Sequence, residues 1–127
     1  MNKKRVALLS LALLTACSLS SNNQTQLELI AENRANLLNS KLPLERGLLS
    51  IMHVVAKKTT IEISILYNKD VKNTGTLNKI LNVSTRNYCQ NPDIKKNLNV
   101  GIKYLIKIHN NRGRLITEQH IDQNSCS

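Results

Sequence analysis

The chain has 127 residues, enough for one small domain with a single core, and 18 Lys and Arg against 8 Asp and Glu give it a net charge of +10. A basic chain can bind nucleic acid, but this one has no Trp or Phe, and Tyr67, Tyr88 and Tyr104 do not form the aromatic ladder on which single-strand binders stack bases. The composition therefore favours a domain that attracts anionic surfaces or acidic partner segments rather than nucleic acid.

The amino terminus has the pattern of an export signal. Residues 3–5 are basic, and residues 6–14 form an uncharged apolar run that is too short to span a bilayer but suits a signal-peptide core. The run ends in Leu14-Thr15-Ala16-Cys17, which resembles the lipobox of bacterial lipoproteins. The resemblance implies cleavage before Cys17, acylation of its thiol, and transfer by the lipoprotein sorting machinery to the inner leaflet of the outer membrane, because Ser18 rather than Asp follows. The alternative is a plain signal peptide with an incidental cysteine.

The sequence then divides into three segments. Residues 1–16 are the expected signal peptide, and their loss removes three basic residues and no acid, which lowers the net charge from +10 to +7. Residues 17–24 are rich in Ser, Asn and Gln, which predicts a lipidated, solvated tether of at most about 25 Å. Residues 25–127 are the expected domain, held close to the membrane surface.

An amphipathic helix is expected to open this domain near Thr25 and to end before Pro43. Arg34 interrupts its apolar stripe, which places the helix at the edge of the core. The stripe consists of Leu27, Ile30, Ala31, Leu37 and Leu38.

Two strands should follow as a hairpin. Residues 47–55 are nearly all apolar, which predicts a strand covered on both faces, and residues 60–66 alternate between isoleucine and polar residues. Residues 56–59 would form the turn, without a Gly to fix its type. His53 within the first strand is expected at the edge of the core, not as a metal ligand.

The second half of the domain reads as helices followed by another hairpin. A polar loop, 68–75, precedes a helix over 76–88, and Asn91-Pro92-Asp93 provides an N-cap, a helix-starting proline and a first-turn acid for a short helix ending near Leu98. Residues 102–108 alternate, residues 110–113 form a turn, and residues 115–121 return. The order predicts one α+β domain with a mainly antiparallel sheet of about four to five strands packed on helices.

The cysteine count predicts one disulfide. With Cys17 acylated, Cys89 and Cys126 remain as an even pair in an oxidising compartment, 37 positions apart. A redox-active pair is disfavoured because such pairs usually lie close together as C-x-x-C.

No signature of an enzyme is present. The three histidines, His53, His109 and His120, have no recognisable nucleophile near them in sequence, and neither a glycine-rich phosphate loop nor a metal-ligand spacing occurs. We therefore expect no catalytic residue, no cofactor and no metal site.

A resemblance to a known family rests on the order of several short segments. These are residues 39–43, 59–61, 89–93 and 101–104, with the isoleucine alternation and Asp122 shortly before Cys126. Together they resemble the pilotin lipoproteins of type II secretion systems, of the AspS or GspS-beta type. The resemblance covers nearly the whole mature chain.

The resemblance implies an escort function at the periplasmic face of the outer membrane. Pilotins of this kind bind the C-terminal segment of a secretin subunit, carry it to the outer membrane and promote assembly of the secretin ring. The alternatives are a pilotin for a type IV pilus or type III secretin, or a non-enzymatic envelope lipoprotein or inhibitor. An inhibitor of the cationic enzyme lysozyme is disfavoured because a +7 chain would repel it.

A binding groove for that segment is predicted on the strands. A disordered peptide that folds into an amphipathic helix needs an apolar groove flanked by charge. The apolar strand and the lysines around Leu105 could supply it. The candidate partner-binding residues are Leu48, Met52, Val54, Lys103, Leu105 and Lys107.

Overall fold

The structure, a computed structural model, describes residues 9–68 and 75–127, with side chains from residue 23 onward except that of Arg46. The elements in chain order are α2 (Leu9–Asn39), β1 (Leu44–Arg46), β2 (Leu49–Lys57), β3 (Thr60–Tyr67), α3 (Gly75–Gln90), α4 (Pro92–Asn99), β4 (Lys103–His109), β5 (Leu115–Ile121) and the 3-10 helix η1 (Gln123–Cys126). Most of the expected polar loop, 68–75, lies outside the described residues.

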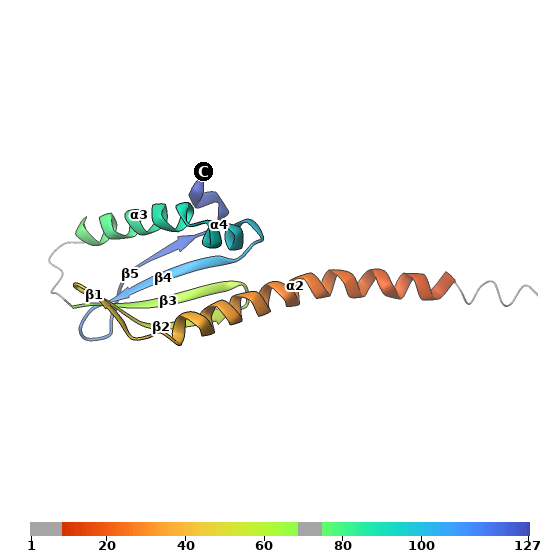
Figure 1. The fold of residues 1–127 in the computed structure, drawn as a ribbon, viewed down its shortest axis with the longest axis horizontal. Helices are drawn as coiled ribbons and strands as arrows, with labels where there is room; N and C mark the ends of the chain where they lie inside the picture. The colour runs from red at the N-terminus through yellow and green to blue at the C-terminus, as the bar shows by residue number, and fades with distance from the viewer. Residues whose placement is uncertain (1–8, 69–74) are drawn as a thin grey trace, which may run out of the picture.

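The strands form one five-stranded sheet in the order β1-β2-β3-β4-β5 (Figure 1). The pairs β1-β2, β2-β3 and β4-β5 are antiparallel, whereas β3 and β4 are parallel, with Thr60 opposite Lys103 and Leu66 opposite His109. The α+β fold with a mainly antiparallel sheet is thus confirmed. The parallel pair was not predicted; it arises because α3 and α4 form the crossover connection that such a pair requires.

The core lies between the sheet and the helices. The alternation predicted for β4 is confirmed, since Tyr104, Ile106 and Ile108 are buried, and Ile61 and Ile63 of β3 lie beside the first two in register. Figure 1 shows α3 and α4 over one side of the sheet. The buried side chains that α3 and α4 contribute to this core are Leu77, Leu81 and Leu98.

Helices α3 and α4 confirm the expectations from the sequence. The side chain of Asn91 accepts hydrogen bonds from the backbone N–H groups of Asp93, at 3.0 Å, and Ile94, at 3.2 Å, which makes it the N-cap of α4. A disulfide joins Cys89 near the end of α3 to Cys126 in η1. The bond therefore fixes the junction of α3 and α4 to the C-terminal end of the chain.

Strand β2 differs from the expectation. The sequence predicted a strand covered on both faces, but Met52 is 51% exposed and His53 is also exposed, next to a register shift between Ile51 and His53. The two exposed residues lie at this bulge, where Met52 has no partner in the register with β3, and directly follow Ile51, the last residue of β2 that pairs with β1. Beyond Ile51 no other strand among the described residues pairs with the outer edge of β2.

The side chain of Asn39 takes the place of a strand partner at this edge. Its Oδ1 accepts a hydrogen bond from the backbone N–H of Val54 at 2.9 Å, and its Nδ2 donates to the backbone carbonyl of Val54. Both backbone groups of a buried residue are thereby satisfied from the last residue of α2. This pairing fixes the end of α2 against the edge of β2.

We expect the Asn39→Ala variant to lose about 2 kcal/mol of unfolding free energy, because two part-buried backbone groups lose their partners while the helix gains only the small propensity advantage of Ala. Urea denaturation measures the change. The matched control is Asn36→Ala, which truncates an exposed side chain on the same helix. Equal stability of the two variants would rule out this role of Asn39.

Helix α2 begins earlier than predicted. It starts at Leu9 instead of near Thr25, so residues 17–24 are helical rather than an extended tether, and Figure 1 shows this end projecting away from the sheet. Ser, Asn and Gln cost a helix only a few tenths of a kcal/mol each, and adding residues to an existing helix is easier than starting one. Neither α2 nor any other helix within the described ranges has the length and apolar character that crossing a bilayer requires.

The buried face of α2 also differs from the predicted stripe. Ala31 and Ala35 are almost fully buried, whereas Ile30 and Leu37 are 42% and 51% exposed. The small side chains of these alanines allow the helix to pack close to β2, which larger side chains at the same positions would prevent. The larger apolar side chains therefore remain on a second face of α2.

Candidate functional site

The structure does not bring the six predicted partner-binding residues together. Val54 is only 1% exposed and faces the core, so the prediction that it contacts a partner is wrong for this structure. Lys103, Leu105 and Lys107 alternate with the buried residues of β4 and so lie on the opposite face of the sheet. Leu48, in the turn between β1 and β2, and Met52, beside the bulge, are exposed near the other edge.

Lys107 forms an ion pair with Glu62 on that opposite face. Its Nζ lies 2.6 Å from Oε1 of Glu62, and Nζ of Lys57 lies 2.9 Å from Oε2 of the same carboxylate. The hydrogen bond from Lys107 is the main cause that lowers the pKa of Glu62, against the opposing effect of burial. Part of the positive charge near Leu105 is therefore already compensated within the protein.

An open groove lies between α2 and α4. One depression, of about 400 Å³, is lined by Ile30, Asn33, Arg34 and Leu37 from α2 and by Asp93, Lys96 and Asn97 from α4. A second, of about 470 Å³, is lined by Asn23, Gln26, Leu27, Ile30 and Val100. Because Ile30 lines both, the two depressions adjoin at this residue, and together we call them the α2–α4 groove.

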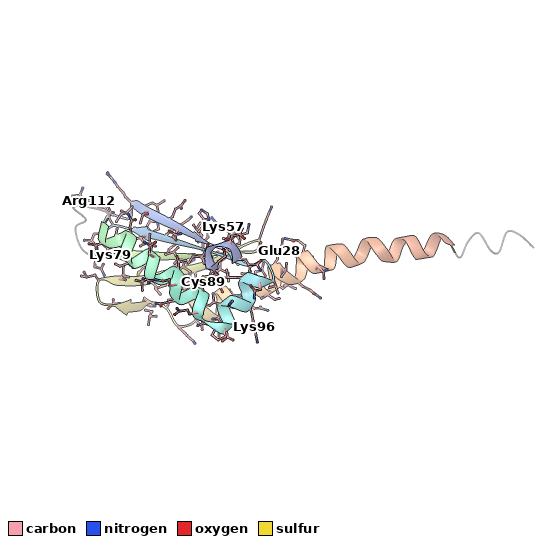
Figure 2. All side chains as sticks on the ribbon, turned by 90° about the horizontal axis from the view of Figure 1, so that it is seen from above. Glu28, Lys57, Lys79, Cys89, Lys96 and Arg112 are labelled. Carbon is pink, nitrogen blue, oxygen red and sulfur yellow. A yellow bond between two sulfur atoms is a disulfide. The ribbon has the colours of Figure 1, made fainter. Side chains whose placement is uncertain are left out.

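The sequence builds the two walls of the groove separately. Because α2 buries Ala31 and Ala35 against the sheet, Ile30 and Leu37, seven positions apart, share a neighbouring face. The other wall, α4, is held in place by its buried Leu98 and by Asn97, whose Nδ2 donates to Oη of Tyr104 at 3.2 Å. The two helices can be followed in Figure 2 from Lys96 on α4 and Glu28 on α2.

Arg34 is the unusual residue of the groove. Its Nε is buried and has no hydrogen-bond partner among the described residues. Tyr88 packs edge-on against Tyr104, with 5.3 Å between the ring centroids. Burial raises the pKa of Tyr88 to about 12 although the positive charge of Arg34 opposes the shift, so the phenol is neutral and forms no ion pair with Arg34.

This arrangement suits polypeptide binding. The groove combines exposed Ile30, Leu37 and Val100 with charged and amide side chains along its walls. Within residues 9–68 and 75–127, no three His, Cys, Asp or Glu residues gather in a way that could hold a metal ion. Sequence reasoning missed the groove because Ile30 and Leu37 were assigned to the core; the signal was an apolar stripe too wide for one buried face.

Cys17 lies within α2, but its side chain is outside the part of the chain whose side chains are described. Acylation of Cys17 therefore stays a prediction from the sequence. The pairing of Cys89 with Cys126 is present in the structure.

A family model and two solved pilotin structures assign the chain to one family. A model of the type II secretion system (T2SS) pilotin, S protein, family matches residues 23–126. The chain is similar to the pilotin EpsS from the Vibrio vulnificus type 2 secretion system, with a TM-score of 0.78 and 36% identity, covering 84% of this chain and 97% of that one. It is also similar to the type II secretion system pilotin AspS from Vibrio cholerae, with a TM-score of 0.74 and 41% identity, covering 84% and 98%. The structure of the ETEC pilotin–secretin AspS–GspD complex shares the fold at a TM-score of 0.55 and 23% identity, covering 77% and 89%.

Proposed function

Because the chain belongs to the type II secretion system pilotin family, we propose that it is an outer-membrane lipoprotein that binds the C-terminal segment of a secretin subunit. It pilots the targeting and assembly of that secretin in the outer membrane. Pilotins of this family are not enzymes, in agreement with the prediction from the sequence. The family also selects type II secretion over the type IV pilus and type III alternatives.

The observation that carries the proposal is the α2–α4 groove. It leaves Ile30 and Leu37 about half exposed along one face of α2, with Asn33, Arg34 and Lys96 beside them. Such a surface accepts an amphipathic helix, whose apolar residues pack into the groove while polar residues meet its walls. A relative, AspS, has been solved in complex with the secretin GspD.

The anchor is the second part of the proposal. We infer that Cys17 is acylated and holds the chain to the periplasmic face of the outer membrane. Thirteen helical positions separate Cys17 from Ile30, which is a rise of about 20 Å. The groove would therefore work close to the lipid surface, where a secretin subunit must insert.

The experiment is an affinity purification of the tagged, lipidated protein from detergent-solubilised outer membranes. We expect the secretin to co-purify with the wild type, and we expect Leu37→Asp to reduce the recovered secretin at least tenfold, because the substitution replaces an apolar contact with a carboxylate that must be desolvated when the partner binds. The matched control is Leu115→Asp, at a site on β5 with nearly the same exposure, 50% against 51%.

Two outcomes would count against the proposal. Absence of the secretin from the wild-type eluate would contradict secretin binding. Equal recovery with Leu37→Asp and Leu115→Asp would place the binding surface outside the α2–α4 groove.

A further inference from the structure

We propose that Arg34 is the specificity residue of the α2–α4 groove: its guanidinium binds a carboxylate of the secretin segment between two apolar side chains that pack on Ile30 and Leu37. This inference rests on the proposed function and adds a sequence requirement for the partner. The partner helix should carry apolar residues seven positions apart and an Asp or Glu three or four positions after the first of them.

The spacing follows from α2 itself. Ile30 and Leu37 are two helical turns apart, about 10 Å along the axis, and Arg34 lies between them in the same depression. A helix docked alongside α2 presents one face through residues spaced three, four and seven apart. Its two outer positions then meet the apolar side chains, and its middle position meets Arg34.

Arg34 forms no ion pair within the described part of the chain. Its Nε is buried without a hydrogen-bond acceptor, and Tyr88 stays neutral at physiological pH because its pKa is about 12. A guanidinium group binds a carboxylate through two parallel hydrogen bonds, and this geometry uses Nε together with a terminal nitrogen. Because Nε is covered in this conformation, the Arg34 side chain must rotate to offer Nε and a terminal nitrogen to an incoming carboxylate. That contact would then satisfy the buried donor and compensate the charge together.

The surroundings of Arg34 favour an acidic segment over a neutral one. Asn33 and Asn97 add amide donors to the same depression, and Lys96 adds a second positive charge against the single acid Asp93. The mature chain is predicted to carry +7, which attracts an acidic segment over longer range. Both effects act in the same direction.

The occupant is a polypeptide helix rather than a small anion. The groove continues from Leu37 back to Asn23, a distance of fourteen positions or about 21 Å along α2. Apolar side chains of Ile30, Leu37 and Val100 line much of this length. About four turns of a partner helix would cover it, whereas a small anion would leave the apolar surface exposed.

The test measures peptide affinity with the lipidated mature protein in detergent micelles. The probe is a fluorescent synthetic peptide covering the last 30 or so residues of the secretin subunit from the same secretion system, compared with a version whose Asp and Glu residues are replaced by Asn and Gln. We expect Arg34→Gln to weaken binding of the native peptide about 10- to 100-fold, because one member of a desolvated charge pair is removed. The amide peptide should lose affinity for the wild type similarly and be nearly insensitive to Arg34→Gln.

Two further variants separate geometry from charge. Arg34→Lys keeps the positive charge but loses the bidentate geometry, so it should restore only part of the affinity. Arg112→Gln removes one positive charge from the exposed turn between β4 and β5, at the other end of the domain in Figure 2, and should leave affinity within about twofold. Circular dichroism verifies that each variant is folded.

The outcomes distinguish the two proposals. If the native peptide does not bind the wild type at all, the proposed function fails. If it binds but Arg34→Gln and Arg112→Gln behave alike, the role of Arg34 is refuted while secretin binding stands. If Arg34→Gln does not fold, the comparison of the two peptides on the wild type decides, and equal affinities overturn the inference.

Discussion

We expect removal of the disulfide by the double substitution Cys89→Ala and Cys126→Ala to lower the free energy of unfolding by about 4 kcal/mol. The bond closes a loop of 37 positions, and the loss of chain entropy in the unfolded state gives this magnitude. Small domains are stable by only about 5–15 kcal/mol, so the loss is a large fraction of the total. Urea unfolding of the purified protein measures it.

The structure indicates where the effect of this substitution should appear. Cys89 lies two residues before the N-cap of α4, and Cys126 lies in the terminal 3-10 helix, so the bond holds one wall of the α2–α4 groove. The control is the wild-type protein unfolded under reducing conditions, which should match the double variant. A loss below about 1 kcal/mol would show that the noncovalent contacts of α3, α4 and η1 are sufficient.

We expect Cys17→Ser to release nearly all of the protein from the membrane. Each buried acyl CH₂ contributes about 0.8 kcal/mol, so the several chains expected on Cys17 hold the protein firmly, and the hydroxyl of Ser cannot form the thioether. Membrane fractionation measures the distribution, and intact-mass analysis of the wild type should show a diacylglyceryl group on a chain beginning at Cys17.

The control for this experiment is Ser21→Ala, a substitution beyond the lipobox-like segment that leaves the thiol in place. It should fractionate with the membrane like the wild type. An unmodified thiol at Cys17, with the protein free in the periplasm, would contradict lipid anchoring.

Most of the regular elements could be predicted because their patterns are local. The alternation around Tyr104, Ile106 and Ile108 identified β4, and the Asn91 cap with Pro92 identified the start of α4. Each of these signals needs only a few neighbouring residues. The disulfide also followed from a simple count of the cysteines.

The remaining features depend on contacts between distant segments. Strand β1 has three residues, too few for a pattern, and exists because it pairs with the first part of β2. The parallel pairing of β3 with β4 depends on how α3 and α4 cross the sheet. The early start of α2 was missed because a Ser- and Asn-rich segment has no apolar period, although the helix can extend through it.

The candidate site was misplaced for a related reason. The sequence gives α2 a broad apolar stripe, and the contact with β2 decides which part of it is buried. The alanines fit that contact, so Ile30 and Leu37 line the groove instead of the core. For Val54 the opposite holds: the sequence analysis assigned it to partner binding, and the structure buries it in the core.

The most direct measurement of the central claim is the location of the secretin in cells that lack this chain. After density-gradient separation of the two membranes, we expect outer-membrane secretin multimers to be lost and unassembled subunits to remain with the inner membrane, and we expect the wild-type gene to restore the multimers. Normal amounts of assembled secretin in the outer membrane of the deletion strain would contradict the account.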